Sequence, residues 1–67
     1  MINIIALRPG DRLQLRGHII AEVTENMEDG MWVEVRYVEA SEAKDVGRVE
    51  LCHAQDIATV LTGSQAL

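Results

Sequence analysis

Cys52 and His53 are the neighbouring side chains that could do covalent chemistry, because a thiol beside an imidazole places a nucleophile beside a base. Successive residues of a strand point to opposite faces, however, so these two side chains cannot meet if the segment is extended. Cys52 then lies on the presented face without an activating partner, and such a thiol is normally unreactive. The sequence therefore predicts no catalytic dyad.

A metal site needs three or four ligands that converge on one point. His18, Glu50 and Cys52 share a strand parity, but only the neighbourhood of their strands links them. The sequence also has no Gly-rich phosphate loop and no Gly-x-Ser-x-Gly motif. We therefore expect no catalytic, cofactor-binding or metal-binding residue, and we expect that the protein is not an enzyme.

The remaining polar chemistry comes from arginines, which outnumber the single lysine, Lys44, in a chain of net charge −5. An acidic chain gains little from the counterion release that drives nucleic-acid binding. Arginine suits fixed, bidentate pairing with carboxylates. Ion pairs across neighbouring strands are the simplest interpretation, and an arginine-containing interface is the alternative.

Trp32 supports the interface hypothesis, because tryptophan together with arginine is typical of binding hot spots. The predicted interaction surface consists of Trp32, Arg36, Val38, Ile20, Arg12 and Arg48. A sharply coiled sheet would instead let Trp32 cap a second, minor core. Both interpretations stay open at this stage.

The element that would position this surface is the segment Met31 to Glu39, the longest run of β-branched and aromatic residues. Its alternation of apolar and mixed positions predicts a strand with one buried face. The other predicted strands are 12–16, 18–25, 48–52 and 57–61. Turn signals at Pro9-Gly10 and at 26–30 separate them.

Three segments are less regular. Residues 2–7 form an apolar stretch that reads as a possible leading strand, buried on both sides or packed against a neighbouring subunit. Residues 40–47 are too few for more than a helical turn, although an amphipathic helix competes there. A helix over 54–61 also competes with one 3₁₀ turn at 53–56 followed by the last strand.

Short strands with a turn about every ten residues predict an all-β fold. At 67 residues, a small five-stranded barrel with a 3₁₀ turn before its last strand is the expected architecture. We expect one domain over residues 1–61 and a flexible C-terminal tail over 62–67. The predicted core consists of Leu13, Leu15, Ile19, Val23, Met31, Val33, Val35, Tyr37, Val49 and Leu51.

Several motifs resemble the SH3-like small barrels over residues 9–61: Gly10-Asp11-Arg12-Leu13, Gly17-His18-Ile19-Ile20, Gly47-Arg48-Val49-Glu50-Leu51 and Asp56-Ile57. The pattern is most similar to the plasmid-borne type II dihydrofolate reductases, whose Val-Gln-Ile-Tyr motif holds folate and the nicotinamide cofactor. This chain has Glu50, Leu51 and Cys52 there, and an acidic Glu50 would repel those anionic ligands. The resemblance thus implies the fold without the activity.

A second resemblance, to the bacterial Sm-like RNA-binding barrels, rests on Leu-Gln-Leu-Arg-Gly-His-Ile and on the ending that contains His53. It implies a nucleic-acid-associated barrel as an alternative function. Cys52 stands at the position of that family's lysine, and the family's N-terminal helix has no counterpart.

The small size of the chain favours self-association, because a core this small gives marginal stability alone. No apolar run is long enough to cross a membrane, and neither a signal peptide nor a second cysteine is present. We therefore expect a cytoplasmic protein without a membrane partner. The predicted function is a non-enzymatic interaction module that needs no cofactor and binds itself or a larger protein.

Overall fold

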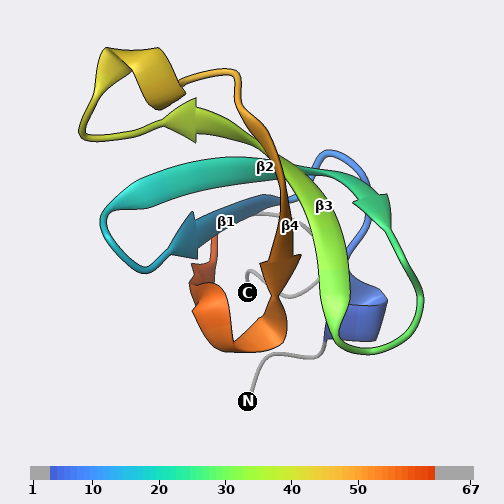
Figure 1. The fold of residues 1–67 in the computed structure, drawn as a ribbon. Coiled ribbons are helices and arrows are strands. Elements are labelled where there is room, and N and C mark those ends of the chain that lie inside the picture. The colour runs from blue at the N-terminus through green and yellow to red at the C-terminus, as the bar shows by residue number, and fades with distance from the viewer. Residues whose placement is uncertain (1–3, 62–67) are drawn as a thin grey trace.

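The computed structural model describes residues 4–61, which form five antiparallel strands and three short 3₁₀ helices (Figure 1). The strands are β1 (Arg12–Leu15), β2 (Ile19–Asn26), β3 (Trp32–Glu39), β4 (Val49–His53) and β5 (Ile57–Val60). The 3₁₀ helices are η1 (Ile4–Ala6), η2 (Ala43–Asp45) and η3 (Ala54–Asp56). The predicted all-β fold with a 3₁₀ turn before its last strand is confirmed, and the predicted tail 62–67 lies outside the described residues.

The strands make one sheet in the order β4-β3-β2-β1-β5. The first four strands are paired in chain order, and β5 returns to the free side of β1. The sheet curls strongly, as Figure 1 shows, but it does not close, because within residues 4–61 β4 and β5 do not pair with each other. The expected barrel is therefore an open, curled sheet with two edge strands.

Two tight turns depend on backbone that is left-handed. The β1–β2 turn has positive φ at Gly17 (84°) and at His18 (62°), which explains why a glycine interrupts an otherwise regular apolar pattern. The segments predicted as strands at 12–16 and 18–25 are thus joined by a hairpin turn that reverses the chain, since Leu15 pairs with Ile19. The β2–β3 turn has positive φ at Glu28 and Gly30, as the Asp-Gly signal predicts.

The core lies on the concave side of the curled sheet. Its buried apolar residues are Ile4, Leu7, Leu13, Leu15, Ala21, Val23, Val33, Val35, Cys52 and Ile57. Five members of the predicted core are confirmed: Leu13, Leu15, Val23, Val33 and Val35. The predicted core residues Ile19 and Tyr37 are half-buried and pack against this cluster.

The prediction was wrong for β4, whose inward side is the opposite of the expected one. Val49 is 53% exposed and Leu51 60% exposed, whereas Cys52 is buried. The reason is a β-bulge: Gly47 donates its N–H to the Tyr37 carbonyl, while Tyr37 donates its own N–H to the carbonyl of the next residue, Arg48. Two residues thus oppose one, with Gly47 at φ 91°, and this extra residue reverses the faces of the strand that follows.

Two further expectations are corrected and one ambiguity is resolved. Met31, predicted in the core, is half exposed, because it belongs to the turn before β3. The apolar N-terminal stretch contains the 3₁₀ turn η1 instead of a strand, and it still supplies Ile4 and Leu7 to the core. The segment with competing helix and strand interpretations contains η3 and then the strand β5.

Candidate interaction surface

A group of apolar side chains lies on the convex side of β3 and β4. We call Trp32, Val49, Leu51 and His53 the outer strip. Trp32 pairs with His53, and the next outward pairs are Glu34 with Leu51 and Arg36 with Val49. Leu51 and Val49 are more than half exposed, and Trp32 is 37% exposed. Three large apolar side chains are thus exposed on one face of an edge strand and its neighbour.

Trp32 is positioned by the turn that precedes it. The Asp29 carboxylate accepts hydrogen bonds from the Met31 N–H (2.9 Å) and from the Trp32 N–H (3.0 Å). These two bonds, that from Met31 first, lower the pKa of the Asp29 carboxyl. The ionised side chain therefore fixes the start of β3, from which Trp32 projects to the outside.

His53 is held in place by the turn that follows it. Its Nδ1 accepts a hydrogen bond from the Gln55 N–H (3.1 Å), and its own main-chain N–H donates to Asp56 (3.4 Å), as in a capping box. The imidazole meets the Trp32 ring edge-on, with 4.9 Å between centroids and 81° between planes. Trp32 therefore packs against a fixed neighbour on β4, although it keeps more than a third of its surface exposed.

The polar rim of the strip is made of cross-strand pairs. Arg36 lies 3.9 Å from Glu22 of the neighbouring strand β2, and Thr24 donates its hydroxyl to Glu34 (2.8 Å). Such exposed ion pairs contribute little to stability, but they fix where charge sits around an apolar centre. An apolar centre with a polar rim is the usual anatomy of a protein interface.

The six residues predicted as an interaction surface do not all share this face. Trp32, Arg36 and Val38 point outward from β3, and Ile20 is half-buried on the outward side of β2. Arg12 is exposed on β1, across from Glu22.

Arg48 lies elsewhere, opposite Tyr37, because the bulge places it on the concave side of β4. There its guanidinium pairs with Asp45 (3.3 Å) and with Glu50 (3.3 Å). Val49 and Leu51, the residues that sequence reasoning missed, occupy the outward positions instead.

Cys52 and His53 point to opposite sides, as the sequence predicts, so they form no dyad. The thiol is buried against Val33, and this burial, together with the charge of Asp56, raises its pKa to about 11. A thiol of this kind is a poor nucleophile. Among residues 4–61, no group of three or more His, Cys, Asp or Glu side chains is placed to hold a metal ion.

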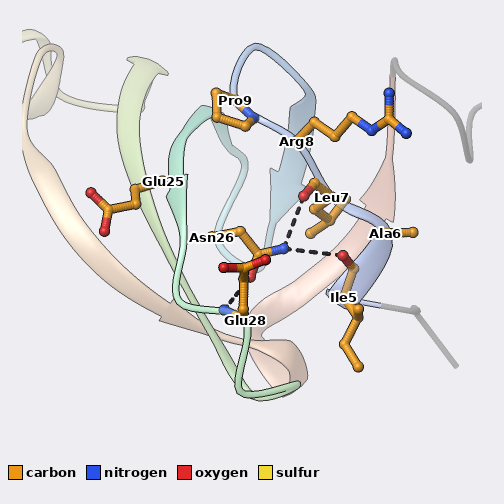
Figure 2. Close-up of a pocket in the computed structure, with 8 residues that line it drawn as sticks. All are labelled: Ile5, Ala6, Leu7, Arg8, Pro9, Glu25, Asn26 and Glu28. Atoms are coloured by element: carbon orange, nitrogen blue, oxygen red, sulfur yellow. Dashed lines mark hydrogen bonds between the residues drawn. The ribbon is translucent and has the colours of Figure 1, made fainter.

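A cavity of about 460 Å³ lies between η1 and the end of β2, lined by residues of 5–9 and 25–28 (Figure 2). Figure 2 shows Asn26 pointing at the N-terminal segment, where its amide donates to the carbonyls of Leu7 (2.9 Å) and Ile5 (3.4 Å). The same amide also donates to the Ile4 carbonyl (2.9 Å). Its Oδ1 accepts from the Glu28 N–H (2.8 Å). The Asn26 side chain at this cavity thus fastens the N-terminal segment to the end of β2.

Comparison with known proteins gives no relative: no family model, no curated protein and no solved structure matches this chain. Within the described part of the chain, no helix has the length and apolar character needed to cross a membrane.

Proposed function

We propose that this chain is a non-enzymatic interaction module that associates with itself through the outer strip. One observation carries the proposal: Leu51 and Val49 are 60% and 53% exposed on an edge strand, on the same outer face of the sheet as Trp32. Exposed leucine and valine on an edge strand favour association, because both the side chains and the main chain gain a partner. A larger protein that docks on the same strip is the alternative occupant.

At the level of the fold, we propose a relationship to the SH3-like small barrels. A four-strand meander, a 3₁₀ turn and a fifth strand that returns to β1 support it. The proposal includes a cytoplasmic setting, which the single buried thiol supports, because unpaired cysteines are typical of reducing compartments.

The nucleic-acid alternative has less support. A surface for phosphate groups needs arginines that can reach the ligand, and here several are already engaged. Arg36 pairs with Glu22, Arg48 with two carboxylates, and Arg16 donates from Nε to the Gln55 carbonyl (2.9 Å). Each of these contacts would have to be broken or shared.

Sedimentation equilibrium over a range of protein concentrations tests the proposed self-association. We expect the wild type to associate, Leu51→Ser to associate about tenfold or more weakly because apolar burial is lost, and Trp32→Ala to weaken association while leaving the circular dichroism spectrum unchanged. The matched control is Ile5→Ser, since Ile5 is 65% exposed but lies outside the strip. A strictly monomeric wild type at high concentration would contradict self-association and favour the larger partner.

A further inference from the structure

The outer side of β4 carries main-chain groups that no strand of residues 4–61 uses. Tyr37 donates its N–H to the Arg48 carbonyl (2.8 Å), and Ala54 donates its N–H to the Met31 carbonyl (3.0 Å). In an antiparallel ladder the residues that bond to the neighbour alternate, so Arg48, Glu50 and Cys52 turn their main chain toward β3. Val49 and Leu51 therefore turn their N–H and C=O groups outward.

We propose that the β4 edge pairs with the β4 edge of a second copy of this chain, antiparallel and around a two-fold axis at Val49. The inference rests on the proposed self-association and adds its geometry. It joins two sheets into one, so that Val49 of one copy lies opposite Val49 of the other at the centre of the contact. A two-fold axis makes the contact self-complementary, which is the commonest arrangement in homodimers.

Charge selects this register among the three that the outward-turned residues allow. An axis at Glu50 would place two glutamates directly opposite each other, which is unfavourable. An axis at Leu51 would place Glu50 opposite Cys52 and Arg48 opposite Ala54, so no ion pair would form across it. An axis at Val49 instead places Arg48 of each copy opposite Glu50 of the other. Arg48 and Glu50, which already pair within one copy, can then also pair across the axis, whereas the alternative registers bring no opposite charges together.

The side chains needed for these pairs already stand at the edge. Arg48 is 57% exposed and Glu50 41% exposed, and they lie 3.3 Å apart within one copy. A small cavity of about 150 Å³ lies on the same side, lined in part by Leu15, Tyr37 and Leu51. Within residues 4–61, β4 is an end strand of the sheet, so a strand of a second copy would meet its unpaired edge.

Mixing two charge variants tests the register. Arg48→Glu makes both positions acidic, and Glu50→Arg makes both basic. We expect each variant alone to dimerise about tenfold or more weakly than the wild type, because like charges then face each other twice. An equimolar mixture should recover wild-type affinity as a heterodimer, and so should the chain that carries both changes. Native mass spectrometry of the mixture, with one variant isotope-labelled, identifies the heterodimer.

The controls separate this inference from the proposed function. Lys44→Glu and Glu42→Lys change the net charge by the same amounts as the two test variants, but they do so at an ion pair (3.1 Å) that lies outside β4. They should change neither the dimerisation of each variant alone nor the formation of a heterodimer in the mixture. If Leu51→Ser weakens association but the charge variants associate as the wild type does, the edge pairing is wrong and the proposed function stands. If the wild type is monomeric, both are wrong.

Discussion

The two edges of this sheet differ in what they present. On β5 the exposed residues are Ala58 and Thr59, which are small or polar, and Ile57 is buried. On β4 the exposed residues are Val49 and Leu51. Both strands end the same sheet, so their position alone cannot explain the difference.

Natural edge strands are usually protected by lysine, proline, inward charge or short length. The four residues of β5 meet this description through their length and side chains. The sequence of β4, Val-Glu-Leu-Cys-His, has an inward charge at Glu50 but neither lysine nor proline, and its outward side chains Val49 and Leu51 are large and apolar. This contrast between the two edges is what the proposed self-association through β4 predicts.

The largest expected effect is on the free energy of unfolding, and it compares a leucine of β1, which pairs with β5, with a leucine of β4. Leu13 on β1, beside β5, is fully buried, so Leu13→Ala should lower the free energy of unfolding by about 2–5 kcal/mol. Leu51→Ala should change it by no more than about 0.5 kcal/mol, because an exposed side chain loses little on truncation. Urea unfolding at a protein concentration low enough to keep the chain monomeric measures both. A large loss at Leu51 would show that it belongs to the core.

The next effect comes from proline on adjacent residues of β4. Glu50→Pro removes an N–H that faces β3 and should cost about 1–3 kcal/mol of stability through the unpaired carbonyl that it leaves. Leu51→Pro removes an N–H that faces outward, so the monomer should stay folded while association is lost. Thermal unfolding and sedimentation separate the two results. Leu51→Pro that dimerises normally would contradict edge pairing, and Leu51→Thr controls for the lost side chain.

Much of the fold follows from local patterns. β3 could be predicted because its apolar positions 33, 35 and 37 alternate with Glu34 and Arg36, so only one face can be buried. The turns follow from their glycines. On β4 the same alternation shows two faces but does not identify the inner one, because Val49 and Leu51 compete with Glu50 and Cys52. The bulge at Gly47 decides, and a bulge depends on tertiary hydrogen bonds that no local pattern contains.

The candidate surface was therefore only partly predictable. Trp32 and Arg36 could be placed on the presented face, since they lie on the well-defined strand β3. Val49 and Leu51 could not, because apolar residues of a strand are assigned to the core unless the register says otherwise. The exposed apolar residues that indicate the site are thus the same residues that sequence reasoning places inside.

The smallest effect tests the faces of β4 through Cys52. Burial holds the pKa of its thiol at about 11, above its ordinary value of 9.0, so the folded state keeps its proton where the unfolded state loses it. Stability from this group is complete below pH 9 and falls by about 1.4 kcal/mol per pH unit as the pH rises from 9 toward 11. Burial also raises the pKa of Tyr37, so the fall must be measured as a difference between chains. Cys52→Ala should be less stable than the wild type at neutral pH, yet its free energy of unfolding should fall less as the pH is raised. Urea unfolding at a series of alkaline pH values measures both. Equal slopes for the two chains would mean that the thiol is as accessible folded as unfolded, and the outward side of β4 would then be the one that carries Cys52.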